Sequence, residues 1–517
     1  MDLLVQDLYD LRRSFFWGAS GALGSHPQRA GVKEGEVFLP SMPLENLGDR
    51  SFTKDYGLRF PYVAGAMANG IASESLVKAM AENGMLGIFG SAGLSPSRVE
   101  GALKNLKKAL GEKAFGANLI HSPSEPQLEE EIVDLYLKLG LSVVEASAFL
   151  DLTLPIVRYR LSGIYQDSHG KVCCPNRVIG KVSRIEVARK FMAPAPDKFL
   201  QILLQQGHLT PAQVQMAKKV PIAQDITAEA DSGGHTDNRP SFALIPTILA
   251  LSSEMQEKYQ YKDPLRVGAA GGIGTPQAAA SAFSMGAAYI VVGSVHQACV
   301  ESGSSDVVRQ MLAKAEQADI AMAPSADMFE MGVKVQVLKR GTMFAMRAGR
   351  LLELYRKYKD LSELPAKEKA SLEKLYFKRS CEMEWQSTRA FFLARDPRQV
   401  ERAEKDPRHL MALLFRSYLG QASRWANEGA DDRVMDYQVW CGPAMGAFNQ
   451  WVKGSFLESV ENRKAATVAL NLLYGAALCF RGQSLRSQGQ MVPRQILAPR
   501  PRTAEEILSI VDERTIN

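Results

Sequence analysis

The stretch RVGAAGGIGTPQAAASAFSMGAAYIVVGS, residues 266–294, indicates the fold most directly. It holds two short apolar runs, the first ending in the turn Gly271-Gly272 and the second in Gly293-Ser294, with a helical pattern between them. Glycine lets backbone N–H groups approach an anion, and the start of a helix adds a favourable dipole. Two such turns at the ends of neighbouring strands predict a phosphate site, with tight turn packing without a ligand as the alternative.

The same alternation of apolar run, turn and helical pattern recurs from residue 60 onward. Parallel strands that are buried on both faces give continuous apolar runs, and helices separate them in the chain. Eight such units predict an α/β fold, a closed TIM-type (β/α)₈ barrel, in which the loops after strands seven and eight often bind phosphate. An open doubly wound sheet is the structural alternative. The predicted strands are 62–66, 85–89, 115–119, 142–146, 178–182, 221–225, 266–270 and 289–292.

The chain divides into three predicted regions. An N-terminal extension covers 1–58, the barrel covers 59–345, and a helical region with a flexible tail covers 346–517. A helical insertion at about 191–220 interrupts the barrel between strands five and six, because Gly207 and Pro211 mark a turn between two helical patterns. The segment 493–502 is rich in proline and arginine, and we expect it to be poorly ordered.

The composition favours a soluble cytoplasmic protein. Hydrophobic residues make up 46% of the chain and charged residues 23%, which is ordinary for globular proteins. The six cysteines show neither a CxxC pair nor a metal-ligand spacing, so reduced thiols and no metal site are expected. The first residues do not resemble a secretory signal. The longest apolar stretch, 465–480, is interrupted by Asn471 and is too short to span a membrane, so a buried helix is expected there.

Positive charge is concentrated between Gly170 and Val220. Nine basic and two acidic residues there give a net charge of +7, while the whole chain carries +6. Such a block can attract an acidic protein partner, although ordinary solvated surface is the alternative for each residue. Basic and aromatic residues are not interleaved as in an RNA-binding sheet, so no nucleic-acid partner is expected.

Three further segments place small and polar residues at strand ends. The first strand ends in the small residues of AGAMANG, where a larger side chain at Ala66 or Ala68 would block a flat ring lying across the barrel. Asn118 and Lys181 lie at the ends of two other predicted strands, and their amide and ammonium groups could hydrogen-bond the polar edge of a flavin. Structural pairing is the alternative for both residues.

The third segment, DITAEADSGGHTDNRP, follows strand six and carries a histidine. Gly233-Gly234 place His235 on a tight loop at the same end of the barrel. Histidine suits proton transfer near neutral pH and hydrogen bonding to a carbonyl or phosphate group. We therefore predict a functional role for His235, and a weaker case for His121 and His296, which follow other strands. The residues contain no GxSxG, HExxH or catalytic triad motif.

Taken together, AGAMANG, GGH, AAGGI and VGS resemble, in order and spacing, the FMN-dependent barrel family of nitronate monooxygenases and flavin enoyl reductases. Longer segments are similar to a narrower branch, the trans-acting (PfaD-type) enoyl reductases of polyunsaturated fatty acid and polyketide synthases. These segments are KVSRIEVARKFMAPAP, DSGGHTDNRP, APSADMFEMGVKVQVLKRGTMF and DYQVWCGPAMGAFNQWVKGSF. One departure is Val295, where a more polar residue is expected beside the phosphate.

The resemblance implies an FMN-dependent enoyl reductase that uses NADPH. Hydride would pass from NADPH through FMN to the β-carbon of an enoyl thioester on an acyl carrier protein, with His235 as proton source or oxyanion donor. The acidic carrier protein would suit the basic block. The expected cofactor-binding residues are Ala66, Met67, Ala68, Asn118, Lys181, Gly233, Gly234, Gly271, Gly272, Gly293 and Ser294. The pathway, the acyl chain length and the oligomeric state, a homo-oligomer included, stay open.

Three other functions compete with this interpretation. A nitronate monooxygenase-like FMN oxidoreductase would need neither the helical insertion nor the C-terminal helical region. A carrier-binding protein without flavin would have no need of intact glycines at both phosphate turns. An IMP dehydrogenase-like enzyme needs a cysteine soon after Gly272, and the nearest one, Cys299, follows the eighth strand.

Overall fold

A computed structural model describes residues 7–18, 21–22, 36–121, 123 and 125–512. Its centre is a closed barrel of eight parallel strands in the order β10-β11-β13-β14-β4-β5-β6-β7. Pairing of β7 with β10 closes the circle, so the predicted TIM-type barrel is confirmed and the open sheet is wrong. The strands are β4 (Tyr62–Ala64), β5 (Leu86–Phe89), β6 (Gly116–Ile120), β7 (Val143–Ser147), β10 (Arg177–Val182), β11 (Asp225–Glu229), β13 (Arg266–Ala270) and β14 (Ile290–Val292).

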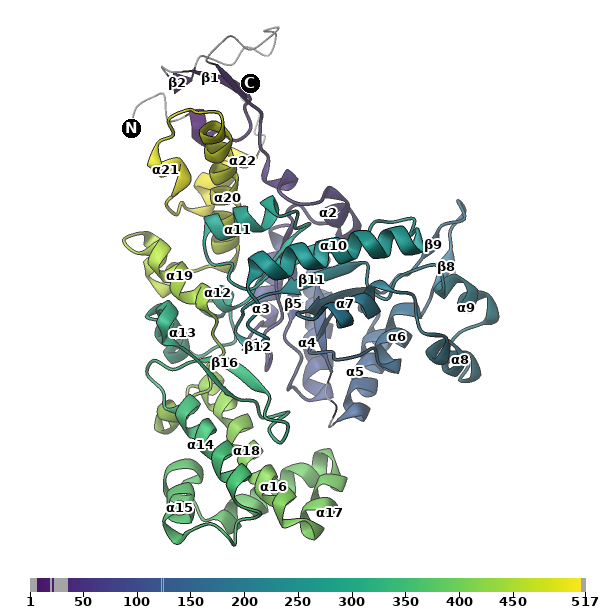
Figure 1. The fold of residues 1–517 in the computed structure, drawn as a ribbon, viewed down its shortest axis with the longest axis vertical. Helices are drawn as coiled ribbons and strands as arrows, with labels where there is room; N and C mark the ends of the chain where they lie inside the picture. The colour runs from purple at the N-terminus through teal and green to yellow at the C-terminus, as the bar shows by residue number, and fades with distance from the viewer. Residues whose placement is uncertain (1–6, 19–20, 23–35, 122, 124, 513–517) are drawn as a thin grey trace.

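Helices follow the strands and cover the outside of the barrel (Figure 1). Three of them begin at an N-cap side chain, because Ser73, Ser95 and Thr275 each accept a hydrogen bond from a first-turn N–H group of the helix that follows. The helices are α3 (Glu74–Glu82), α4 (Pro96–Leu110), α5 (Pro126–Leu139), α6 (Leu154–Leu161), α7 (Ile185–Met192), α10 (Ser241–Tyr259), α11 (Pro276–Ser284) and α12 (Ser294–Gln297).

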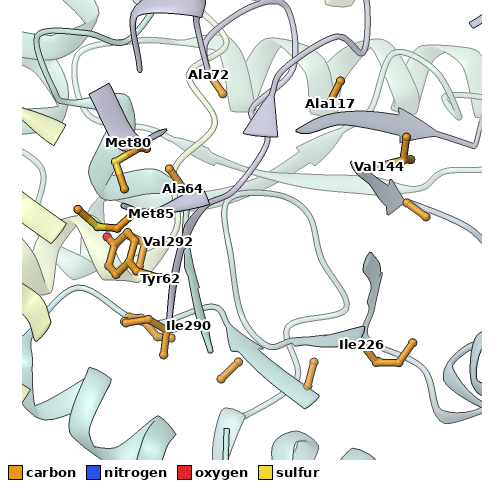
Figure 2. Close-up of a cluster of buried hydrophobic side chains, with 14 of the residues drawn as sticks. Tyr62, Ala64, Ala72, Met80, Met85, Ala117, Val144, Ile226, Ile290 and Val292 are labelled. Atoms are coloured by element: carbon orange, nitrogen blue, oxygen red, sulfur yellow. The ribbon is translucent and has the colours of Figure 1, made fainter. Parts of the chain in front are cut away.

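The strands are apolar on both faces for two different reasons. Outward side chains such as Tyr62, Ala64 and Val292 pack against the helix layer, near Met80 and Met85 in Figure 2. The alternate residues fill the inside of the barrel as a separate cluster that includes Val63, Leu86, Ile88, Val143, Ile179, Tyr289 and Val291. Double burial explains the continuous apolar runs of the sequence.

The sixth strand is displaced from its prediction. It covers β11, Asp225–Glu229, rather than 221–225, so the predicted position was wrong by four residues. The apolar residues Ile222 and Ala223 lie in the preceding loop, where their N–H groups donate to the end of α7. The strand itself escapes an apolar-run search, because polar Asp225, Thr227 and Glu229 alternate along it and face the barrel interior.

The helical insertion predicted between strands five and six is present as α8 (Asp197–Gln205) and α9 (Pro211–Ala217). A small hairpin, β8 (Tyr165–Gln166) with β9 (Val172–Cys173), precedes β10 and was not predicted. Both insertions connect a helix to the next strand, which places them at the amino-terminal end of the barrel. Arg266 closes this end of the barrel. It forms a buried ion pair with Asp225 and a second ion pair with Asp55 of α2 (Arg50–Tyr56).

A second, three-stranded sheet follows the barrel. Strands β15 (Ile320–Pro324) and β16 (Lys334–Leu338) form an antiparallel pair, and the short β12 (Gly234–His235) joins the free edge of β16. Helix α14 then packs against this sheet, and α15 to α18 follow at the lower end of the view in Figure 1. They are α14 (Phe344–Lys357), α15 (Ala366–Ser371), the π-helical turn Leu372–Phe377, α16 (Cys381–Arg395), α17 (Pro397–Lys405) and α18 (Pro407–Glu428).

The last helices return to the barrel. Helices α13 (Asp306–Ala313) and α19 (Pro443–Val452) flank α12, and α20 (Ala465–Ser487) packs against α11. Helix α20 is long and apolar enough to cross a membrane, but 89% of its most apolar window is buried inside the protein. A buried helix at 465–480 was the prediction, and it is confirmed.

Both ends of the described chain pack beside α20. Strands β1 (Phe15–Gly18), β2 (Gly21–Ala22) and β3 (Val37–Leu39) form a small sheet there. The segment 493–502, expected to be poorly ordered, holds α21 (Arg494–Leu497). Its Pro499 and Arg502 carbonyls accept hydrogen bonds from Trp451 and Asn471, before α22 (Ala504–Val511) begins. Side-chain donors on neighbouring helices therefore hold a segment whose composition alone suggests a loose tail.

Candidate active site

Two glycine turns lie side by side at the carboxyl end of the barrel. We call this end, formed by the loops that follow the eight strands, the barrel mouth. Gly271 and Gly272 have φ angles of 86° and 74°, a conformation that favours glycine. A Cβ atom on Gly271 would lie 2.6 Å from the backbone of Ala230, whereas none of the described residues comes within 4 Å of one on Gly272. The second turn, Gly293-Ser294, opens α12 on the neighbouring strand β14. The predicted pair of turns is therefore in place.

The C-terminal region also reaches these turns. The Gly442 N–H group donates to Ser294 Oγ at 3.1 Å, and Gly442 is the residue before α19. Gly233 lies against the same segment, since a Cβ atom there would be 2.9 Å from Gly442 N. Gly274 packs even more closely against the Ala444 carbonyl. The segment WCGPAMG was quoted only for its family resemblance, and its place beside the glycine turns was not predicted, although glycine before proline is a signal for a helix start.

The loop after β4 lies across the barrel mouth. Its Ala66 N–H group donates to Glu145 Oε2 at 3.3 Å, and the Met67 carbonyl accepts from Ala72 N–H at 3.1 Å. Helix α18 secures the far side of the loop, because Asn69 Nδ2 donates to Ser423 Oγ at 2.5 Å. Ala66, Met67 and Ala68 are half-buried, so this loop presents small groups and backbone at the mouth.

Asn118 is partly committed to the protein itself. Its Oδ1 atom accepts hydrogen bonds from the N–H groups of Ser91 at 2.9 Å and Ala92 at 3.2 Å, which shapes the loop after β5. The Nδ2 amide is then the group that Asn118 can offer to a ligand. The structural alternative for this residue is therefore correct for one half of the side chain.

Lys181 shares the barrel mouth with two carboxylates that the sequence analysis did not single out. Its ammonium group is 2.9 Å from Glu229 Oε1, and each of the two side chains is 17% exposed. Burial lowers the pKa of Lys181, but the charges of Glu229 and Glu145 outweigh burial, so the pKa is raised and the lysine stays charged. Both carboxylates could have been predicted from the alternation of the strands. Glu145, for example, lies two positions after the inward-facing Val143 and therefore points to the same side.

Glu145 is fully buried beneath the Ala66 loop. Burial raises the pKa of its carboxyl group, with a further increase from the charge of Glu229 and a decrease from that of Lys181. Its Oε1 atom has no hydrogen-bond partner among the described residues. Leaving a buried polar atom unpaired costs about 1–3 kcal/mol.

His235 lies at the edge of the same mouth and is held from outside the barrel. The β12–β16 pairing sets His235 opposite Val335, and Nε2 is 3.1 Å from Asp327 Oδ2. Burial lowers the pKa of His235, but the hydrogen bond and charge of Asp327, with help from Glu229, raise it overall. Gln336 fixes the loop by donating from Nε2 to Asp231 Oδ1 and the Ser232 carbonyl.

The two weaker histidine candidates have structural partners. His121 Nδ1 is 3.0 Å from the buried Glu129 Oε2. His296 is fully buried, its Nε2 lies 2.7 Å from the hydroxyl of Tyr62, and burial lowers its pKa to about 3. A neutral, enclosed imidazole is a core residue. Val295, noted as a departure from the family pattern, is likewise buried in the core.

The basic block does not form a free basic surface. Seven of its nine basic residues are within ion-pair distance of a carboxylate, and six of those seven carboxylates lie outside the block, which neutralises it. Four of the nine, Lys171, Lys198, Lys218 and Lys219, also belong to the two insertions at the amino-terminal end of the barrel, opposite the mouth. The expected role of the block in attracting an acidic partner therefore lacks support, because linear charge counting ignores the acids that folding brings alongside.

Comparisons with known proteins give a consistent result. Residues 358–437 match the family described as the inserted helical domain of [acyl-carrier-protein] S-malonyltransferase. The chain is 46% identical over 495 residues to a polyunsaturated fatty acid synthase polypeptide of Thraustochytrium sp., covering 94% of this chain and 33% of that protein. It is 45% identical over 450 residues to the polyketide biosynthesis protein PksE of Bacillus subtilis, covering 87% and 58% respectively.

A solved structure agrees over a similar extent. The enoyl reductase domain of MlnA, from the macrolactin biosynthesis cluster of Bacillus amyloliquefaciens, is 40% identical and superimposes with a TM-score of 0.82. The match covers 86% of this chain and 100% of that domain. The chain thus spans one whole solved domain, but only about a third of the fatty acid synthase polypeptide and about three fifths of PksE.

Proposed function

Because the chain belongs to the family of the enoyl reductases of polyunsaturated fatty acid and polyketide synthases, we propose that it is a trans-acting enoyl reductase. Its proposed substrate is an enoyl thioester on an acyl carrier protein, and its proposed cofactors are FMN and NADPH. The observation that carries the proposal is the position of His235, which Asp327 holds at the barrel mouth beside the glycine turns.

The glycine turns fit the phosphate of FMN. Backbone N–H groups of Gly271, Gly272, Gly293 and Ser294 would hold it, with Gly233 and Gly234 allowing the His235 loop to pass close by. The open space at Gly272 leaves room for such a group, because none of the described residues lies within 4 Å of a Cβ atom built there. The start of α19 adds a second helix dipole of favourable sign beside α12.

The rest of the mouth fits a flat ring system. Ala66, Met67 and Ala68 would lie against the ring, and the Asn118 amide and the charged Lys181 would donate hydrogen bonds to its polar edge. When bound, FMN supplies two-electron transfer between a nicotinamide and a carbon–carbon double bond. A lysine that stays protonated stabilises negative charge nearby, which favours the electron-rich form of such a ring.

His235 would act on the substrate. Reduction of an enoyl thioester places negative charge on the thioester oxygen, and a hydrogen-bond donor aimed at that oxygen stabilises the transition state. Asp327 favours the protonated imidazole, which is the form with donors on both nitrogens. The raised pKa keeps this form present toward neutral pH, and the donor is lost as the pH rises through that pKa.

The proposal can be tested by following the two half-reactions separately. FMN-loaded protein should lose its yellow colour on anaerobic addition of NADPH and regain it on addition of an enoyl thioester such as a crotonyl thioester. Reoxidation only by oxygen, together with turnover of a nitronate, would instead support the nitronate monooxygenase-like function. If NADPH reduces the flavin but neither an enoyl thioester nor a nitronate reacts with it, the enoyl reductase function is contradicted and the nitronate monooxygenase-like function gains no support.

The acyl carrier protein should dock at the mouth, since its thioester must reach His235. Arg239 is exposed there, beside Phe242, which is 74% exposed. We expect Arg239→Glu to raise KM for a carrier-bound substrate several-fold and to leave a small thioester unaffected, because a rim charge attracts the acidic carrier. The matched control is Lys219→Glu, an exposed basic residue at the opposite end of the barrel. Equal effects of the two variants, or equal losses on both substrates, would argue against docking at this rim.

A further inference from the structure

Asp327, the partner of His235, lies outside the barrel and on a loop that the C-terminal helices hold. This loop connects β15 to β16, and its Ala326 carbonyl accepts a hydrogen bond from Arg416 Nε of α18 at 3.0 Å. Arg416 also pairs with Glu330, and Phe329 is buried against Phe415. The position of Asp327 therefore depends on a segment that is distant from the barrel in the sequence.

The contact with Asp327 assigns different roles to the two imidazole nitrogens of His235. Nε2 is engaged by the carboxylate at 3.1 Å, so it cannot also point toward a ligand. Within the described part of the chain, no hydrogen-bond partner is found for Nδ1. An imidazole ring that is fixed through one nitrogen holds the other nitrogen in a defined direction. Carboxylates that hydrogen-bond to a functional histidine orient it in this way in many proteins.

We propose that Asp327 is a positioning residue, which accepts a hydrogen bond from the Nε2–H group of His235 and turns its Nδ1–H group toward the thioester oxygen of the substrate. This inference rests on the proposed reductase function and adds a role for the C-terminal helical region. That region would act on the reaction through the loop between β15 and β16, because α18 fixes the loop and the loop fixes the imidazole.

The charged groups around His235 determine how the pair responds to pH. Asp327 and Glu229 favour the imidazolium and Lys181 opposes it, while burial opposes it most strongly. The pKa of Asp327 is itself lowered by His235 despite burial, as expected for an ion pair. Removing the charge of Asp327 should therefore lower the pKa of His235, and the imidazolium should be lost at lower pH than in the wild type.

Two variants separate charge from orientation. Asn at position 327 can still accept a hydrogen bond from Nε2–H but carries no charge, whereas Ala provides neither. We expect Asp327→Asn to move the pH midpoint of the His235 ring protons, measured by NMR on FMN-loaded protein, toward lower pH. The His235→Gln variant identifies the resonance. The pH at which flavin reoxidation by the enoyl thioester declines should move in the same direction.

At low pH the imidazole is protonated in both variants, so only orientation should differ. There we expect Asp327→Asn to approach the wild-type reoxidation rate and Asp327→Ala to remain roughly tenfold or more slower. Reduction by NADPH should be unchanged in both. An unmoved His235 midpoint in Asp327→Asn, or equal losses in both variants at every pH, would overturn the positioning role. If no enoyl thioester reoxidises the flavin of the wild-type protein, the reductase function is overturned instead. The NMR midpoint of His235 would then still show whether Asp327 pairs with it.

Discussion

Replacing His235 by alanine should slow reoxidation of the reduced flavin by an enoyl thioester by roughly 10²–10⁴, the usual contribution of a positioned acid or oxyanion donor. FMN should stay bound, because the phosphate turns lie on other loops. NADPH should still reduce the flavin at the wild-type rate. Stopped-flow absorbance of each half-reaction, measured anaerobically, provides both rates from one protein preparation.

The other outcomes of this variant assign His235 differently. Slow reduction by NADPH with normal reoxidation would place His235 at the nicotinamide. Loss of FMN would make it part of the cofactor site. The control is His208→Ala, a histidine that is exposed in the helical insertion at the opposite end of the barrel. Unchanged rates in both half-reactions would contradict every catalytic role of His235.

Gly272→Asp should abolish FMN binding. The added carboxylate would project into the open space beside the turn and repel the phosphate there. The φ angle of 74° also makes the substitution strained, at a cost of roughly 1–2 kcal/mol, so strain must be separated from charge. Visible absorbance after incubation with FMN and gel filtration measures the bound fraction.

The chain contains a matched control for strain. Gly207 in the helical insertion has a φ angle of 75°, and none of the described residues lies within 4 Å of its absent side chain. Gly207→Asp therefore introduces the same residue at the same backbone conformation, far from the mouth, and should leave FMN binding intact. Gly272→Asp protein that binds FMN as tightly as the wild type would show that the phosphate lies elsewhere.

The barrel could be predicted because its signal is local. Each strand is buried on both faces and therefore gives a continuous apolar run. Each helix is buried on one face and therefore gives an apolar residue every three or four positions. The glycine turns were predictable for a related reason, since φ angles such as those of Gly271 and Gly272 restrict which residues can occupy the position. Only β11 was misplaced, where polar inward residues hide the strand.

The candidate site could be predicted only in part. His235 and Lys181 were found because Lys181 ends one strand and His235 follows another, and the ends of parallel strands meet at one end of a barrel. Their partners Asp327 and Glu229 were not found, because ion pairs leave no periodic trace in the sequence. The charge of the basic block was misjudged for the same reason: its neutralising acids, such as Glu254 opposite Arg189, lie on other elements.

The sequence by itself thus determined the barrel, its two glycine turns and the loop that carries the histidine. All of these follow from burial patterns and backbone conformation, which neighbouring residues decide together. Only the tertiary structure decided which groups act on these residues. Asp327 reaches His235 through the second sheet, and Gly442 meets Ser294 across 148 residues of chain. Such contacts depend on where whole elements pack, and no local stretch of sequence specifies that.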